Sequence, residues 1–345
     1  MIQTEYYRML GSVIAEIAQK CDFEHASGSG VTKALVVEGT TDELFAGRVL
    51  EKDARCFPIR RILVNRGAFI GKGIDLKNIN SKDVILDLFQ RLSNNPDFFG
   101  FPKGCGEWAI YGLIDRDFDD EALAYRRPRL FITDTHDIET LMLSTDEGVL
   151  TRIGRVRIAA DTVRRALFVS GQMLCFRQAL YRLGDKNRSV DIRCLSSADG
   201  TVHYAAFTEN DLIVPEKMVT HLYKNRGGGL DADKRDSMVR KILADKQLRK
   251  HLDKNGKWKY TKETFTPDRI EDFWLQVRGH DILSAVCYCD PEAGNAFRNT
   301  AGYGLNREFE KALIGAYNLA CFAGTDLYRD MKKAELVVGC SAAEK

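Results

Sequence analysis

The sequence lacks several features that mark common classes of protein. Its formal net charge is only +2 over 345 residues, so the chain as a whole makes no electrostatic argument for nucleic acid, and any such argument has to come from local clusters. None of the nine cysteines forms a C-x-x-C pair or has zinc-ligand spacing, and no secretory leader is expected. Both points favour a reducing cytoplasm. The first helical segment, Thr4 to Lys20, is too polar to span a membrane and is expected to be an amphipathic packing helix.

A nucleotide-binding P-loop is also absent. The segment from Gly67 to Gly73 has three residues between its first glycine and the Gly-Lys pair, where the motif has four, and no Ser or Thr follows. The chain is therefore not expected to hydrolyse ATP, and any ATP dependence would come from a partner.

What is present is the composition of a folded globular chain, with 44% hydrophobic and 29% charged residues. Short apolar runs predict strands, and helical spacing between them, as after Ser81, predicts helices. The predicted strands are 34–37, 61–64, 108–114 and 129–133. This alternation is typical of an α/β fold with a mainly parallel sheet flanked by helices.

The predicted domain organisation has three parts. Residues 1–30 are expected to form an N-terminal helix and linker, and residues 31–145 the α/β domain. Residues 146–345 are expected to form a mostly helical C-terminal domain, with a β-hairpin between 190 and 207.

Three carboxylates are the candidate catalytic centre. Glu38 directly follows the first predicted strand, and ligands bind at that edge of open α/β sheets. Asp115 and Asp117 follow the third strand two residues apart, so they face the same side if the strand geometry persists through them. Because close carboxylates repel unless a cation lies between them, these acids predict a Mg2+ site, with Mn2+ as the other candidate ion. The prediction requires Glu38 to lie near both aspartates and no lysine to fill the space among them.

Further residues near these strand ends are candidates for a second ion or an auxiliary role. The acidic candidates are Asp42, Asp119, Asp137 and Glu139. Asp42 and Asp137 equally fit the start of a helix, and Asp119 fits a solvated turn. His136 and His280 are auxiliary candidates, although a single histidine at a helix start is more often a cap or a core hydrogen-bonding group.

The order of these motifs resembles the TOPRIM domain of primases, topoisomerases and overcoming-lysogenization-defect (OLD) nucleases. The resemblance is carried by V-E-G-x-x-D on the first strand, a glycine after the second and D-x-D on the third, within residues 34–120. The strings around His136 and His280 are similar to stand-alone TOPRIM proteins of bacterial defence loci, such as the effector subunits of PARIS anti-phage systems.

The resemblance implies a metal-dependent nuclease that acts as a toxic effector in abortive infection. Glu38 would be the general acid or base, and Asp115 and Asp117 would hold the metal. It also implies an ATPase partner of the ABC or AAA type that restrains the chain, tRNA as the substrate, and a homo-oligomeric active form. Two alternatives stay open: a DNA endonuclease of the OLD type and a non-catalytic assembly subunit. A primase or topoisomerase fits less well, since the chain lacks a zinc-ribbon cysteine set and strand-passage domains.

A basic segment from Lys234 to Lys262 is the candidate nucleic-acid interface. It carries lysines with two aromatic residues among them, which could stack on bases, but it is equally compatible with a solvated helix face. The candidate residues are Lys250, Lys254, Lys257, Trp258, Lys259 and Tyr260.

Overall fold

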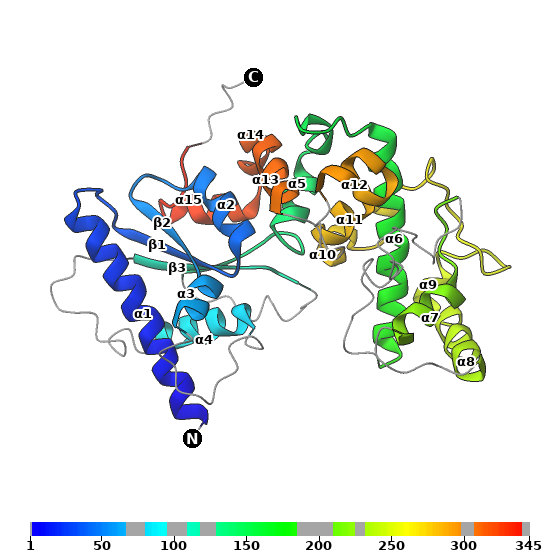
Figure 1. Cartoon of the computed structure of the whole chain (residues 1–345), viewed down its shortest axis with the longest axis horizontal. Helices are drawn as coiled ribbons and strands as arrows, with labels where there is room; N and C mark the ends of the chain where they lie inside the picture. The colour runs from blue at the N-terminus through cyan, green and yellow to red at the C-terminus, as the bar shows by residue number, and fades with distance from the viewer. Residues whose placement is uncertain are drawn as a thin grey trace. The chain divides into compact units, whose positions relative to one another are not determined.

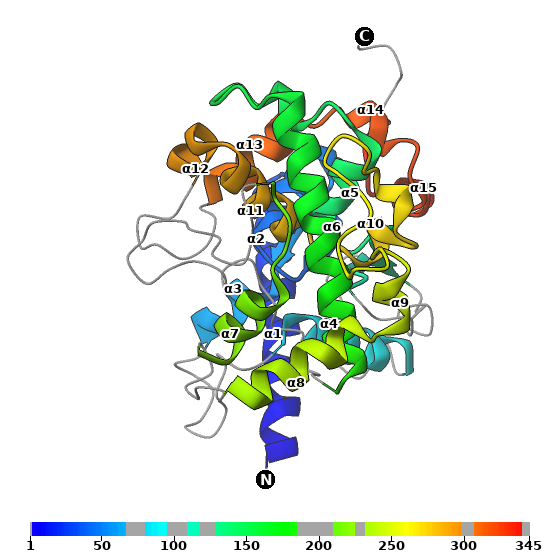
Figure 2. The ribbon, with the colours of Figure 1, turned by 90° about the vertical axis from the view of Figure 1, so that its right-hand side faces the viewer.

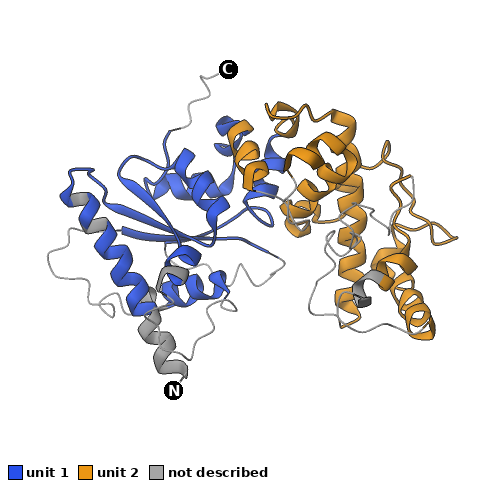
Figure 3. Cartoon of the chain, in the orientation of Figure 1, with its two compact units in different colours: residues 1–146, 317–345 blue, residues 147–316 orange. Residues whose placement is uncertain are grey.

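The computed structural model describes residues 2–66, 80–94, 109–117, 129–184, 210–224, 232–297 and 307–339. The chain divides into two compact units (Figure 3). Unit 1 comprises residues 1–146 and 317–345, and unit 2 comprises residues 147–316. Among the described residues, no helix combines the length and the apolar character that crossing a membrane requires.

Unit 1 is built on a four-stranded parallel sheet with the strand order β2-β1-β3-β4. The strands are β1 (Lys33–Val37), β2 (Ala54–Pro58), β3 (Ala109–Ile114) and β4 (Leu130–Ile132). The α/β class and the parallel sheet predicted from the sequence are therefore confirmed. From β1 the chain continues to β2 on one side, and from β3 to β4 on the other. The strand order thus reverses between β1 and β3, which is where ligands bind in sheets of this kind.

The second predicted strand is wrong. Residues 61–64 belong to the helix α3 (Ile59–Arg66), and the strand lies before it, at β2. A short apolar run does not by itself distinguish a strand from a buried helical turn. Here Ile59, Ile62 and Leu63 are buried at helical spacing, while Pro58 ends an edge strand, where the missing N–H is tolerated.

Helices cover both faces of the sheet (Figure 1). On one face lie α1 (Ile2–Ala26), α3 and α4 (Ser81–Asn94); on the other lie α2 (Thr40–Val49) and α15 (Asp326–Lys333). Leu10, Val13, Ile14 and Ile17 of α1 are buried in one core cluster with residues of β1, α3 and α4. The expected separate region 1–30 is therefore part of unit 1, because the apolar stripe of α1 is buried against that core.

The last described residues also belong to unit 1, contrary to the predicted C-terminal domain of 146–345. The carboxylate of Asp134, just after β4, accepts the backbone N–H groups of Asp326 and Leu327 at 2.7 and 3.0 Å, which fixes the start of α15. The short helix α14 (Leu319–Phe322) packs against α5 (Ile138–Thr145), and Val337 pairs with Leu50. These long-range contacts are not visible in local sequence patterns.

Unit 2 is helical in its described residues, as predicted, and the predicted hairpin between 190 and 207 lies outside them. The helix α6 (Ala160–Arg182) runs through this unit and packs against α11 (Gly279–Cys289) (Figure 2). Buried Arg177 of α6 forms an ion pair with buried Asp281 of α11. The other helices are α7 (Pro215–Lys224), α8 (Ala232–Leu243), α9 (Lys246–Arg249), α10 (Phe273–Gln276), α12 (Pro291–Phe297) and α13 (Arg307–Ala316), with 3-10 turns at Leu150–Arg152 and Pro267–Arg269.

Candidate metal centre

Glu38 and Asp115 lie together where the strand order reverses. Val37 at the end of β1 pairs with Leu113 of β3, so the residues that follow the two strands meet at one edge of the sheet. The backbone N–H of Asp115 donates a hydrogen bond of 2.9 Å to Oε1 of Glu38. The neighbouring strand ends thus place two acids, 77 positions apart in the sequence, side by side.

Several carboxyl groups lie close together at this edge and raise one another's pKa values. Burial, followed by the charges of Asp42 and Asp117, raises the pKa of Glu38 from 4.5 to about 8, against the lowering effect of the Asp115 N–H. Burial, followed by the charge of Asp42 and then that of Glu38, raises the pKa of Asp115 well above its ordinary value. Adjacent carboxyl groups in such a position are stabilised by a bound proton or by a cation.

Asp117 does not follow the strand as predicted. The strand β3 ends at Ile114, and Asp117 has a left-handed backbone with φ of 54°, so the side chains of Asp115 and Asp117 are not related by strand alternation. The backbone N–H of Asp117 donates to the carbonyl oxygen of His136 at 2.9 Å. This bond links the residues after β3 to those after β4.

A lysine lies beside Asp117. Nζ of Lys82, from the first turn of α4, is 2.9 Å from Oδ2 of Asp117 and donates to the carbonyl oxygen of Arg116 at 3.3 Å. Lys82 is only 5% exposed, and its charge also lowers the pKa of Glu38 slightly. A lysine therefore does lie beside one of the three acids, Asp117, and the prediction fails there. Glu38 and Asp115 are still joined by the hydrogen bond between the Asp115 N–H and the Glu38 carboxylate. Sequence reasoning missed Lys82, because lysine is rarely buried and one in the first turn of a helix is expected to be exposed.

Two of the acids considered for a second ion, Asp42 and Asp137, accept backbone N–H groups at helix starts. Oδ2 of Asp42 accepts the backbone N–H of Gly39 at 2.8 Å at the start of α2. Asp137 is the N-cap of α5, where Oδ1 accepts the backbone N–H of Thr140 at 2.8 Å. Nevertheless, the charges of Asp42, Asp137 and Glu139 all raise the pKa of Asp115, so these side chains contribute to the same electrostatic site. Asp119 lies outside the described residues.

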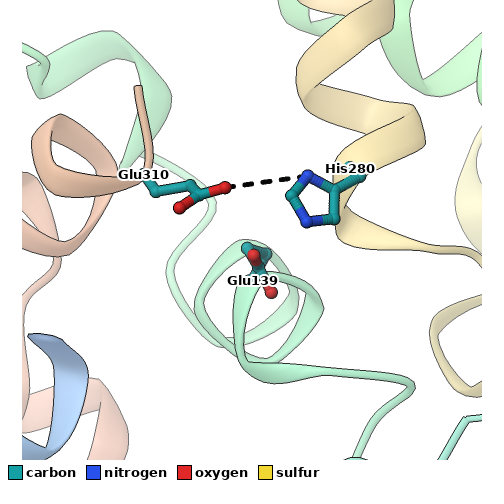
Figure 4. A group of neighbouring side chains, drawn as sticks. All are labelled: Glu139, His280 and Glu310. Carbon is teal, nitrogen blue, oxygen red and sulfur yellow. Dashed lines mark ion pairs between the residues drawn. The ribbon is translucent and has the colours of Figure 1, made fainter. Parts of the chain in front are cut away.

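The two histidine candidates lie in different units. His136 of unit 1 is buried, with Nδ1 3.0 Å from Oδ2 of Asp137. His280 of unit 2 begins α11 with a side chain that is 58% exposed, and its Nδ1 is 3.9 Å from Oε1 of Glu310 on α13 (Figure 4). Glu310 was not a candidate from the sequence, since it lies within an ordinary amphipathic helix.

The side chains at this edge of unit 1 are of the type that hard divalent ions take as ligands. Glu38 and Asp115 supply carboxylate oxygens, the ligands that Mg2+ and Mn2+ prefer, and neighbouring acids provide the charge that such an ion neutralises. Asp117 could join them only if its ion pair with Lys82 opened or rearranged.

In the basic segment, the four candidate lysines are exposed, and Trp258 and Tyr260 are half-buried. The Trp258 ring stacks on that of His251, with centroids 5.7 Å apart and planes at 27°. Base stacking was one of two interpretations of this segment, and the face of the Trp258 ring that packs on His251 is not open to it.

Comparisons with protein-family models, curated proteins and solved structures find no match for this chain. The functional interpretation therefore rests on the residues and their geometry.

Proposed function

We propose that this chain is a Mg2+-dependent nuclease whose active centre is the strand-end site around Glu38 and Asp115. The observation that supports it is the contact between these two acids at the reversal of strand order, together with their raised pKa values. This position also matches the motif order of the TOPRIM resemblance. Glu38 and Asp115 are the proposed catalytic residues, Asp117 would join them only when its ion pair with Lys82 opens, and Mn2+ is a candidate substitute ion.

The chemistry follows from the protonation of Glu38. With a pKa of about 8, its carboxyl group holds a proton at neutral pH and exchanges it readily, as a general acid or base must. The backbone N–H of Asp115 orients one carboxylate oxygen of Glu38. When bound, Mg2+ supplies positive charge that stabilises the phosphoryl oxygens of the scissile bond.

The biological role that the resemblance supports is a toxic effector of an anti-phage abortive-infection system. In this proposal an ATPase partner of the ABC or AAA type restrains the chain, and release of a homo-oligomeric form leads to tRNA cleavage. A DNA endonuclease of the OLD type would use the same site, so the substrate distinguishes the two.

The test is cleavage by the purified chain, alone and released from its partner. Labelled tRNA and supercoiled plasmid are each incubated with Mg2+, Mn2+ or EDTA. We expect divalent-dependent cleavage of tRNA that Glu38→Gln abolishes. Glu43→Gln is the matched control, because Glu43 lies close by in the sequence, on α2, but pairs with Arg61 at 2.7 Å. Cleavage that persists in EDTA, or that Glu38→Gln leaves unchanged, contradicts the proposal.

A non-catalytic assembly subunit is the second candidate, and the Lys82–Asp117 ion pair favours it. An internal lysine neutralises one acid that the metal would otherwise use. In cells, full toxicity or defence by folded Glu38→Gln protein would support the assembly role, and its loss with intact partner binding would support catalysis.

A further inference from the structure

The basic segment of unit 2 forms an ordered, exposed cationic surface. Between residues 246 and 262 the sequence has seven Lys or Arg residues and one acidic residue, Asp253. Six of the basic side chains are exposed, and none forms an ion pair with a carboxylate within the described part of the chain. We call these six residues the lysine surface: Lys246, Arg249, Lys250, Lys254, Lys257 and Lys259.

A small hairpin, residues 251–259, carries three of these residues: Lys254, Lys257 and Lys259. Leu252 pairs with Trp258, and the backbone N–H of Lys259 donates to the carbonyl oxygen of His251 at 2.9 Å. At the turn, Oδ1 of Asp253 accepts the backbone N–H groups of Asn255 and Lys257 at 2.8 and 2.9 Å. The one acidic side chain of the segment is thus used to build the turn, and the lysines around it are presented on a defined backbone.

The aromatic residues of the hairpin face the interior of unit 2. Trp258 lies between two lysines on a strand-like segment, where successive side chains point to opposite faces. Its Nε1 atom is buried and has no hydrogen-bond partner among the described residues, and its ring contacts those of His251 and Tyr260. Tyr260 in turn contacts Phe265. These rings stabilise the hairpin and are not arranged to stack on bases.

We propose that the lysine surface binds the phosphate backbone of nucleic acid and does not read its bases. This inference rests on the proposed nuclease function and specifies how the chain holds its substrate. Contacts between lysine or arginine side chains and phosphate oxygens carry no sequence information, so binding through the lysine surface is expected to be indifferent to sequence and strongly dependent on salt. Within residues 246–262 the aromatic rings pack on one another and on Phe265, which does not favour their insertion into a membrane surface.

The experiment measures binding by fluorescence anisotropy in EDTA, which prevents metal-dependent cleavage. The probes are labelled single-stranded oligo(U) and oligo(A) of equal length, titrated over a range of KCl concentrations. We expect similar affinity for both probes. In Lys254→Gln/Lys257→Gln, the slope of log affinity against log salt should fall by about 1.4 if each lysine contacts one phosphate.

Two controls separate this surface from general charge and from folding. Lys311→Gln/Lys333→Gln removes the same charge at lysines that pair with Glu308 and Asp330, and should leave binding unchanged. Trp258→Phe keeps a ring in the hairpin and should also bind normally. Unchanged binding by the Lys254/Lys257 variant, a strong preference for one probe, or binding to anionic phosphatidylserine vesicles but not to oligonucleotides would each overturn the proposal.

The outcome is distinguishable from that of the nuclease test. Glu38→Gln should bind both probes like the wild type. Binding of the probes without any cleavage would refute the nuclease function and still support the lysine surface. Cleavage that the Lys254/Lys257 change does not affect would support the nuclease function and refute the lysine surface as the place where the substrate binds.

Discussion

Replacing Glu38 with glutamine should stabilise the chain at high pH and not at low pH. Its carboxyl pKa is about 8 in the folded chain and 4.5 ordinarily, so between these values the folded state binds one proton more than the unfolded state. The free energy of unfolding therefore falls as pH rises through this window, and the loss is complete above the folded pKa. Glutamine cannot ionise, so the variant does not share this loss.

The magnitude follows from the same shift. A rise from 4.5 to about 8 corresponds to about 5 kcal/mol as an upper bound. Glu38 is partly exposed, and solvent screening reduces this to a few kcal/mol. We expect the free energy of unfolding of Glu38→Gln to exceed that of the wild type by about 2–4 kcal/mol at pH 9 and to equal it at pH 4.5.

Urea unfolding at pH 4.5 and pH 9, without divalent ions, measures this difference. Glu43→Gln, which removes an ion pair with Arg61 outside the site, should change stability by no more than about 1 kcal/mol at either pH. Adding Mg2+ at pH 9 should reduce the difference in unfolding free energy between Glu38→Gln and the wild type, because a bound cation stabilises the ionised wild-type site and not the amide. The electrostatic reasoning would be refuted if Glu38→Gln and the wild type differed in stability by the same amount at both pH values, or if Glu38→Gln were the less stable of the two at pH 9.

Three further predictions concern packing and charge. Lys82→Met should raise the affinity for Mn2+ about tenfold in calorimetric titrations, because it removes a competing cation, and weaker binding would show that the lysine supports the site. Arg177→Met should lower the free energy of unfolding by about 3–5 kcal/mol, because it leaves the buried carboxylate of Asp281 without the charge it pairs with. In urea titrations, the double variant Arg177→Met/Asp281→Leu should recover part of that loss. Gly112→Ala should cost about 1–3 kcal/mol in the same assay, because the new methyl carbon would lie 2.5 Å from the Phe89 ring; a neutral effect would show that the ring moves away freely.

The strands of unit 1 were largely predictable, apart from the second. Three of them are short apolar runs that end in a turn or in acidic residues, and each lies where the pattern places it. The error at residues 61–64 shows the limit of this reasoning, because the same apolar letters suit a strand and a buried helical turn. Only packing of Ile62 and Leu63 against the core decided between them.

The candidate site was predictable in part for the same reason. In a parallel sheet, residues that follow adjacent strands meet at one edge, so the apolar runs before Glu38 and Asp115 were enough to suggest their neighbourhood. The position of Asp117 depended on a left-handed backbone and on a bond to the carbonyl oxygen of His136, neither of which a local pattern encodes.

The amino-acid sequence by itself determined the strand-forming runs, the acids at their ends and the density of positive charge in the basic segment. These are local properties, set by the hydrophobicity and charge of residues close together in the chain. Only the tertiary structure decided that Lys82 pairs with Asp117, that Trp258 faces inward, and that residues 317–339 pack on unit 1. Each depends on contacts between distant segments, whose free energy is gained only when the chain has folded.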